Sequence, residues 1–127
     1  RDYVGKVLRA PLVAQGDRLI GTAGTITNIA SLSLRLQNYD KTRVQGFVLG
    51  RGRVDEVADL LTGLTSADRR RLPGMEKGRE DIILQGIILL QEVMSYLKAD
   101  EVFVSANGVR FGVLYEMLCM SCVDDLH

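Results

Sequence analysis

A glycine-bracketed turn is the segment of this sequence best suited to chemistry. It follows a brief apolar run, opens into a helical pattern, and consists of Gly21, Thr22, Ala23, Gly24 and Thr25. Backbone N–H groups at the start of a helix converge on one point and carry the positive end of the helix dipole, so they can hold an anion. The glycines let a ligand approach without a Cβ in the way. We therefore expect these residues to bind an anion, while helix–sheet packing alone stays open as another explanation.

Arg110 is the second candidate ligand residue. It follows the apolar run 102–104 and the turn signal Asn107-Gly108, where another helical pattern begins. In open α/β sheets, ligands collect beyond the carboxyl ends of the strands, where both turns would lie. The guanidinium would then reach the anion held by the first turn. A salt bridge to Glu116, or plain solvation, is the alternative interpretation.

The other reactive side chains do not combine into a further site. Cys119 and Cys122 have the spacing of redox or zinc pairs, but His127 is the lone histidine, so a four-ligand zinc site cannot be assembled. We interpret these thiols as structural or incidental. A catalytic Ser-His or Cys-His pair would have to use His127, the last residue of the sequence, so we do not expect this class of active site. Asp81 is interpreted as an acid at a helix start, with ligand binding as the alternative.

Hydrophobic periodicity predicts the elements that must position these residues. It predicts short strands at 18–22, 45–50 and 101–105, and helices at 2–9, 26–37, 54–62, 64–69, 80–98 and 111–120. Long helical stretches between the strands favour a parallel pair over hairpins. Glu80 and Asp81 would lie in the first turn of the 80–98 helix, whose apolar residues on most sides predict burial between other elements. The sequence therefore predicts a helix-rich α/β domain with short parallel strands.

Composition and charge exclude several classes of protein. The 127 residues carry 16 Lys and Arg against 16 Asp and Glu, which argues against nucleic-acid binding through bulk positive charge. Polar residues interrupt the longest apolar stretch, 82–94, so no membrane span is expected. Two cysteines fit a reducing cytoplasm, and a first residue other than Met suggests a piece of a longer protein. Residues 41–79 carry 9 basic and 5 acidic side chains, either as solvated helix faces or as an electropositive rim for a polyphosphate or nucleotide.

Taken in order, these segments resemble the Ppx/GppA phosphatases, a family of exopolyphosphatases and guanosine pentaphosphate phosphohydrolases in the actin-like ATPase superfamily. The likeness rests on Gly21-Thr22-Ala23-Gly24-Thr25, Val44-Gln45-Gly46-Phe47, Leu72-Pro73-Gly74, Arg79-Glu80-Asp81-Ile82-Ile83 with Gly86, Val104-Ser105, and Gly108-Val109-Arg110-Phe111-Gly112-Val113-Leu114-Tyr115-Glu116. The segments cover most of the chain. Phe111 stands where the family commonly has Glu or Asp after the arginine.

The resemblance implies a fold, an activity and partners. Residues 1–127 would form a single domain, the C-terminal part of a ribonuclease H-like (actin-like ATPase) second lobe, with the N-terminal lobe in earlier sequence. The whole protein would be a hydrolase that releases terminal phosphate from inorganic polyphosphate or guanosine pentaphosphate, with Mg²⁺ held by ligands outside this chain. Gly21–Thr25 and Arg110 would line the phosphate or nucleotide cleft. The catalytic base would come from the other lobe, so this piece alone would be inactive.

Two rival hypotheses stay open. A nucleotide-binding member of the same superfamily would use the glycine-bracketed turn for an adenosine nucleotide. A non-catalytic interaction or dimerisation module would use the apolar 82–97 helix, and a homodimer is one form that it could take.

Overall fold

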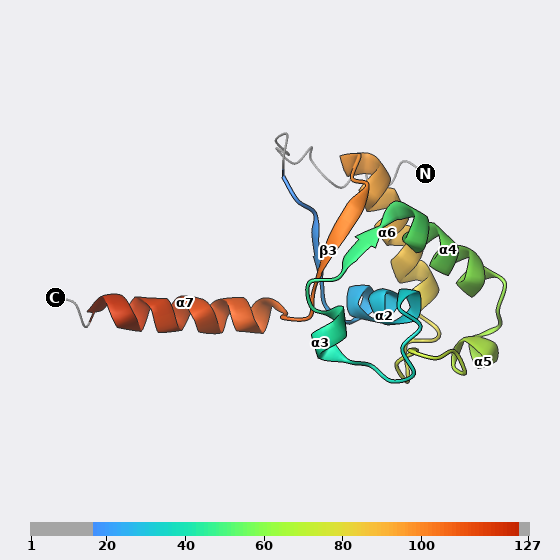
Figure 1. The fold of residues 1–127 in the computed structure, drawn as a ribbon, viewed down its shortest axis with the longest axis horizontal. Coiled ribbons are helices and arrows are strands. Elements are labelled where there is room, and N and C mark those ends of the chain that lie inside the picture. The colour runs from blue at the N-terminus through green and yellow to red at the C-terminus, as the bar shows by residue number, and fades with distance from the viewer. Residues whose placement is uncertain (1–16, 125–127) are drawn as a thin grey trace.

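The backbone of residues 17–124 folds into short strands joined by helices (Figure 1). The computed structural model describes these residues, and its elements are β1 (Ile20–Thr22), α2 (Gly24–Ser33), α3 (Lys41–Val44), β2 (Val48–Gly50), α4 (Arg51–Thr62), α5 (Ser66–Arg69), α6 (Ile83–Leu97), β3 (Glu101–Ser105) and α7 (Val109–Asp124). Side chains cap the two short helices: Asp40 accepts the N–H of Thr42 at α3, and Thr65 accepts the N–H of Asp68 at α5. The helix predicted at 2–9 lies outside the described residues.

A three-stranded mixed sheet joins distant parts of the described chain. Its order is β1-β3-β2. β1 runs parallel to β3, with Thr22 opposite Ser105, which confirms the predicted parallel pair. β2 runs antiparallel to β3, with Leu49 opposite Val102, so the sheet is not purely parallel. The reason is that α3 and a turn at Gly46, with a φ of 76°, return the chain along β3 before α4 begins.

α2 begins and ends earlier than the periodicity predicts. Its first residue is Gly24, with Ala23 at the N-cap position, so the expected caps Thr25 and Thr27 lie inside the helix. At the other end, Arg35 has a φ of 52° and closes a left-handed C-terminal turn. The glycine-bracketed turn therefore leads directly into the helix.

α6 begins three residues later than predicted. The carbonyl of Arg79 accepts the N–H groups of Ile82 and Ile83, which sets the start of the helix at Ile83. Glu80 and Asp81 therefore precede the helix and do not occupy its first turn. Their expected role beside the helix dipole is wrong for this reason.

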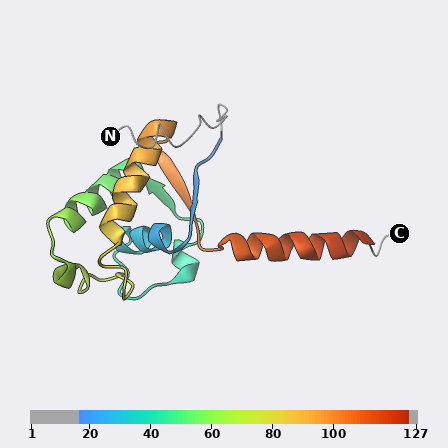
Figure 2. The same cartoon turned by 180° about the vertical axis from the view of Figure 1, so that it is seen from behind.

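α2, α4 and α6 pack against one another on one face of the sheet, and α2 and α4 make the main contacts with that face (Figures 1 and 2). Strand side chains alternate between this face and the outer one, so Val102 and Val104 are buried while Ile20 keeps 65% of its surface exposed. The buried apolar side chains are Ile29, Ala30, Leu32, Leu36, Val44, Leu49, Val54, Val57, Ala58, Leu61, Ile83, Ile87, Leu90, Met94, Val102 and Val104. The core therefore lies between the three helices and the inner face of the sheet.

α6 carries one buried stripe and is not buried on most sides. Ile83, Ile87, Leu90 and Met94 recur at helical spacing and are buried. Leu89, on another side of the helix, keeps 57% of its surface exposed. The prediction of burial between elements is wrong here because, among the described elements, α2 and α4 make the main contacts with α6.

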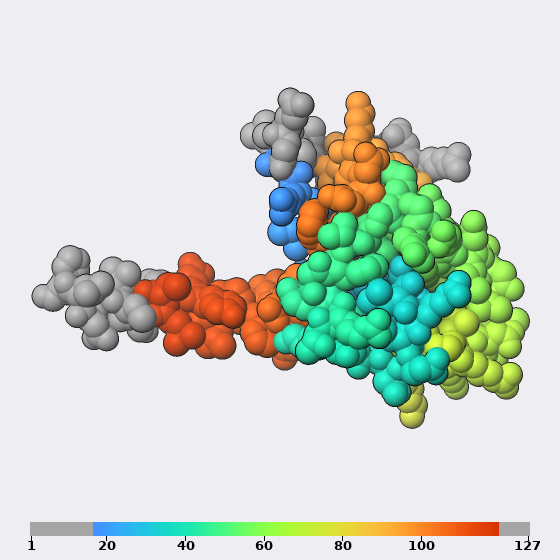
Figure 3. Space-filling model, viewed as in Figure 1, coloured from blue at the N-terminus to red at the C-terminus, as the bar shows by residue number. Residues whose placement is uncertain are grey.

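α7 extends away from the body of the molecule (Figures 1 and 3). Val113, Leu114, Met117 and Leu118 are each at least half exposed along it. α7 makes no extensive contact with another element of residues 17–124. No helix in this part of the chain is long and apolar enough to cross a membrane.

The contact between α6 and α2 at Gly86 tests this packing. A Cβ at Gly86 would lie 2.3 Å from Thr25 Cγ2, so Gly86→Ala should lower the free energy of unfolding by about 1–3 kcal/mol, despite alanine's better helix propensity. Thr25→Ser removes that methyl group, and the remaining side-chain atoms lie 3.5 Å away. In the Thr25→Ser background, Gly86→Ala should be neutral or stabilising by up to about 1 kcal/mol. Urea denaturation measures all four proteins, and additive effects would contradict this contact.

Candidate functional site

The glycine-bracketed turn connects β1 to α2 and leaves the start of α2 uncapped. Ala23 has φ 74° and ψ 172°, a backbone region populated almost only by glycine. No side chain caps the helix, so the N–H groups of Gly24 and Thr25 point out of its end without an intrahelical acceptor. The hydroxyl of Thr27 donates to the carbonyls of Ala23 and Gly24 and is occupied there. Backbone N–H groups are therefore what this turn offers to an anion.

The turn that follows β3 lies beside the glycine-bracketed turn. Thr22 and Ser105 are partners in the parallel pair of β1 and β3. Each of their hydroxyl groups donates to the carbonyl of Asn107, both at 3.1 Å. The carboxyl ends of the two strands thus meet at one edge of the sheet, where ligands bind in open α/β sheets.

Arg110 is exposed at the start of α7. Its guanidinium forms no ion pair with Glu116 within residues 17–124. The structure brings the turn before Arg110 next to Gly21–Thr25, but within residues 17–124 no hydrogen bond joins the Arg110 side chain to Gly21–Thr25. The adjacent Phe111 ring lies 4.5 Å from the ammonium of Lys41. Where the resemblance expects an acidic residue, this chain therefore has a cation–π contact.

The side chain of Arg79 lies beside the N-terminal end of α2. The sequence patterns did not single it out as a ligand residue. Its guanidinium lies directly against the Cα of Gly24, since a Cβ there would come within 1.8 Å of Nη2 and 2.2 Å of Cζ. Nε donates to Glu76 Oε2 at 2.6 Å. In the described part of the chain, the two Nη groups have no acceptor. An arginine with open donors therefore lies beside the uncapped helix end, which suits an anion.

Glu80, the residue after Arg79, carries a buried carboxylate that is 2% exposed. Its Oε1 accepts from Arg70 Nε at 2.6 Å, and its Oε2 accepts from the N–H of Gly78 at 2.7 Å. Hydrogen bonds from its own N–H, from Arg70 and from Gly78 hold the pKa of Glu80 below the usual range for glutamate, although burial raises it. The ionised carboxylate of Glu80 thus joins the residue after Arg79 to Gly78, the residue before it, and to Arg70.

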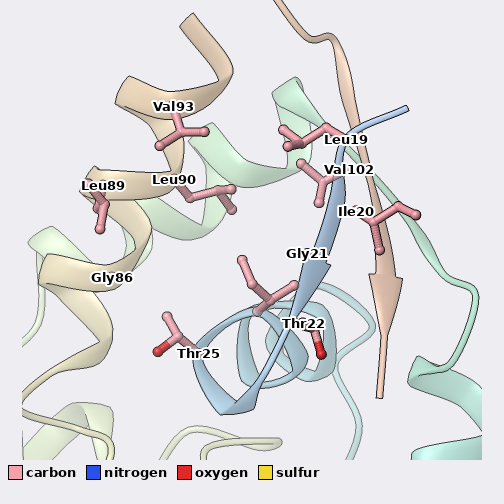
Figure 4. A pocket seen from close by; sticks show the side chains of 11 residues that line it. Leu19, Ile20, Gly21, Thr22, Thr25, Gly86, Leu89, Leu90, Val93 and Val102 are labelled. Carbon is pink, nitrogen blue, oxygen red and sulfur yellow. The ribbon is translucent and has the colours of Figure 1, made fainter. Parts of the chain in front are cut away.

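An apolar groove of about 340 Å³ lies between β1 and α6 (Figure 4). It is lined by Leu19, Ile20, Gly21, Thr22, Thr25, Ile26, Gly86, Leu89, Leu90, Val93 and Val102. In Figure 4, the side chains of α6 face those of β1 and β3 across it. None of these lining residues is charged, so the groove does not suit a phosphate group. The features that suit an anion lie at the N-terminal end of α2.

The remaining sequence candidates do not form a site within residues 17–124. No three His, Cys, Asp or Glu side chains come together there to hold a metal ion. Cys119 is a free, exposed thiol on α7, and nothing is described of the side chains of Cys122 and His127. Asp81 accepts a hydrogen bond from the hydroxyl of Ser66 and so links α5 to the segment before α6.

Comparison with known proteins gives the family and its fold. The sequence profile of the Ppx/GppA phosphatase family matches residues 1–120. Exopolyphosphatase 2 of Mycobacterium tuberculosis is 29% identical over 117 residues, which are 89% of this chain and 37% of that protein. The bifunctional 3-dehydroquinate synthase/phosphatase of Fusobacterium nucleatum is 28% identical over 98 residues, which are 77% of this chain and 14% of that protein.

Solved structures agree with this match. The crystal structure of the Aquifex aeolicus Ppx/GppA family member has a TM-score of 0.78 at 31% identity, over 83% of this chain and 35% of that one. An exopolyphosphatase from Cytophaga hutchinsonii has a TM-score of 0.69 at 25% identity, over 80% of this chain and 33% of that one. The chain therefore belongs to the Ppx/GppA phosphatase family, and the predicted helix-rich α/β fold of the actin-like ATPase type is confirmed. It spans about a third of these two structures, and 37% and 14% of the two curated relatives.

The strained backbone at Ala23 gives a prediction for stability. Glycine adopts a φ of 74° without the Cβ clash that alanine suffers, so Ala23→Gly should raise the free energy of unfolding by about 1 kcal/mol. Ala67→Gly, in the exposed face of α5, is the matched control and should lower it by about 0.5–1 kcal/mol. Urea denaturation measures both, and destabilisation by Ala23→Gly would show that the turn is not strained.

Glu80 predicts a pH dependence of stability. Because folding lowers the pKa of Glu80, its stabilisation is fully present above the pKa of an unfolded glutamate, about 4.3, and is lost as pH falls through the lower pKa of the folded state. Between about pH 5 and pH 3, the free energy of unfolding should therefore fall more steeply for the wild type than for Glu80→Gln. Urea titrations at each pH measure this, with the exposed Glu56→Gln on α4 as the control that should follow the wild type. Parallel curves for wild type and Glu80→Gln would contradict it.

Proposed function

We propose that this chain forms the anion-binding wall of a phosphohydrolase that releases terminal phosphate from inorganic polyphosphate or guanosine pentaphosphate. One observation carries the proposal: the guanidinium of Arg79 lies against Gly24 at the uncapped start of α2. A guanidinium and the positive end of a helix dipole repel each other, and a phosphate bound between them would relieve that repulsion. Membership of the Ppx/GppA phosphatase family supports the reaction class.

The site's donors suit the charge that develops in phosphoryl transfer. Water attacks the terminal phosphorus in line with the leaving oxygen, the P–O bond to the remaining chain breaks, and negative charge spreads over the phosphoryl oxygens. The N–H groups of Gly24 and Thr25, the guanidinium of Arg79 and, from the neighbouring turn, Arg110 would bind these oxygens, which are negatively charged in the substrate as well as in the transition state. Donors that are already in place do so without further reorganisation.

The base that takes the proton from the attacking water would come from the rest of the protein. The two carboxylates beside Arg79 are both occupied, since Glu76 bonds to Arg79 Nε and Glu80 bonds to Arg70 and Gly78. We also expect Mg²⁺ to be held by residues elsewhere, because residues 17–124 offer no set of metal ligands. The part of the protein that faces this wall is thus its main partner.

Phosphate release with Mg²⁺ from long-chain polyphosphate and from guanosine pentaphosphate tests the proposal. We expect release by a polypeptide that extends this chain to the full length of its relatives, and none by residues 1–127 alone. In the longer polypeptide, Arg79→Ala and Arg110→Ala should each lower kcat/KM about tenfold or more, because a hydrogen bond between charged groups contributes about 1.5–3 kcal/mol. Arg53→Ala, an exposed arginine on α4, is the matched control and should leave kcat/KM unchanged.

The outcomes separate the hypotheses. Full activity in both arginine variants would show that this wall does not contact the phosphate. If the longer polypeptide releases phosphate from neither substrate, the phosphohydrolase proposal fails. Competition between nucleotides for binding would then test the nucleotide-binding alternative.

Protein–protein association is a second candidate function, favoured by α7. Val113, Leu114, Met117 and Leu118 leave a large apolar surface exposed on this helix, and such surfaces are usually covered by protein. Sedimentation velocity at rising protein concentration would show which protein surface packs against α7. Self-association of residues 1–127 that disappears in the longer polypeptide would point to the rest of the same protein. Self-association of both would point to a homodimer.

A further inference from the structure

Arg79 lies where its own charge disfavours it. Its guanidinium lies against Gly24 at the positive end of α2, and its recorded side-chain partner is Glu76, whose side chain keeps 29% of its surface exposed. A partly exposed ion pair of this kind typically contributes little to stability. The pair with Glu76 alone therefore does not explain why Arg79 is directed at Gly24.

The backbone around Arg79 supplies the direction. The carbonyl of Arg79 accepts the N–H of Ile83 at 2.9 Å and so joins the start of α6. The preceding residue, Gly78, has a φ of 85°, a conformation that favours glycine. The N–H of Gly78 donates to Glu80 Oε2 at 2.7 Å. Arg79 is thus held between a turn closed by Glu80 and the first turn of a helix.

Glu80 also ties this turn to the segment after α5. Its Oε1 accepts from Arg70 Nε at 2.6 Å and lies 2.5 Å from Nη2, so both carboxylate oxygens are occupied in a side chain that is 2% exposed. A buried carboxylate is expensive to desolvate, and an ion pair whose arginine is 65% exposed adds little stability in return. Fixing one specific conformation is a role that such a pair can serve.

We propose that Glu80 is a positioning residue for the phosphate site, because its buried carboxylate holds the 76–82 turn that directs the Arg79 guanidinium against Gly24. The effect of Glu80 on catalysis rests on the proposed function, whereas its effect on the position of Arg79 can be measured without a substrate. Loss of the carboxylate would free the Gly78 N–H and the Arg70 guanidinium. Arg79 would then sample positions away from α2, where its donors no longer meet the anion.

The structural step is tested by hydrogen exchange at Arg79 in the full-length protein. Selective ¹⁵N-arginine labelling reports the Nε–H of Arg79, with its resonance identified by its absence in Arg79→Lys. In Glu80→Gln we expect exchange at least about tenfold faster, because the hydrogen bond to Glu76 opens more often. Glu56→Gln, which removes an exposed carboxylate on α4, is the matched control and should leave the exchange rate unchanged. An unchanged rate in folded Glu80→Gln would overturn the inference, whatever the function of the site.

The catalytic consequence is tested by kinetics with long-chain polyphosphate as the probe. Glu80→Gln should raise KM about tenfold while kcat changes less than about threefold, as expected for a lost binding contact. Gly24→Ala places a Cβ where the guanidinium lies and leaves Glu80 intact, so it should raise KM similarly. In an Arg79→Ala background, Glu80→Gln should have no further effect, because its action passes through the arginine.

The remaining outcomes separate this inference from the proposed function. Equal effects of Glu80→Gln with and without Arg79 would overturn positioning while leaving the phosphate site in place. Faster exchange with no change of KM in either Glu80→Gln or Arg79→Ala would overturn both the catalytic consequence and the role of Arg79 in binding. If Glu80→Gln does not fold, Arg70→Gln removes the other half of the pair from a side chain that is 65% exposed. It should raise KM in the same direction, and an unchanged KM would overturn the inference.

Discussion

The close approach of other segments to α2, at glycines where a Cβ would not fit, is the constraint on which the rest of the structure depends. A Cβ at Gly21, Gly24, Gly74 or Gly86 would come within 3.0 Å of a neighbouring atom. These glycines bring β1, the Arg79 side chain, the loop before α6 and α6 itself against one helix. Because protein interiors are close-packed, contacts this tight leave the elements little freedom to shift. The same packing that builds the core therefore also shapes the surroundings of the N-terminal end of α2, where an anion can bind.

Buried polar contacts hold the long segment between α5 and α6, which contains little regular structure. The side chain of Asn28, fully buried on α2, donates to the carbonyl of Gly74 at 2.6 Å. Farther along, Glu80 closes the turn around Arg79. Buried polar groups are costly unless they are paired, and such pairing is specific in direction. The segment thus gains a defined path that apolar contacts alone do not specify.

Parts of the fold and of the site followed from the sequence. Apolar runs bounded by glycine predicted strands and helices close to those observed, and the parallel pair of β1 with β3 placed the turn before Arg110 beside Gly21–Thr25. The antiparallel direction of β2 did not follow, because three residues carry no signal of direction. The start of α6 was also missed, since it depends on the Arg79 carbonyl and not on acidic residues near a dipole.

The sequence by itself determined which residues could form helices and strands, where the glycine-bracketed turn lies, and which family the motifs resemble. All of these depend on local spacing, backbone preference or residue order. Only the tertiary structure decided that Arg79 meets Gly24 and that the buried carboxylate of Glu80 pairs with the exposed Arg70. Arg79 and Gly24 lie 55 positions apart in the sequence, and their contact arises from the packing of α2 against α6 and the loop before it. No local pattern encodes such a contact, because it depends on how separate elements fill the same space.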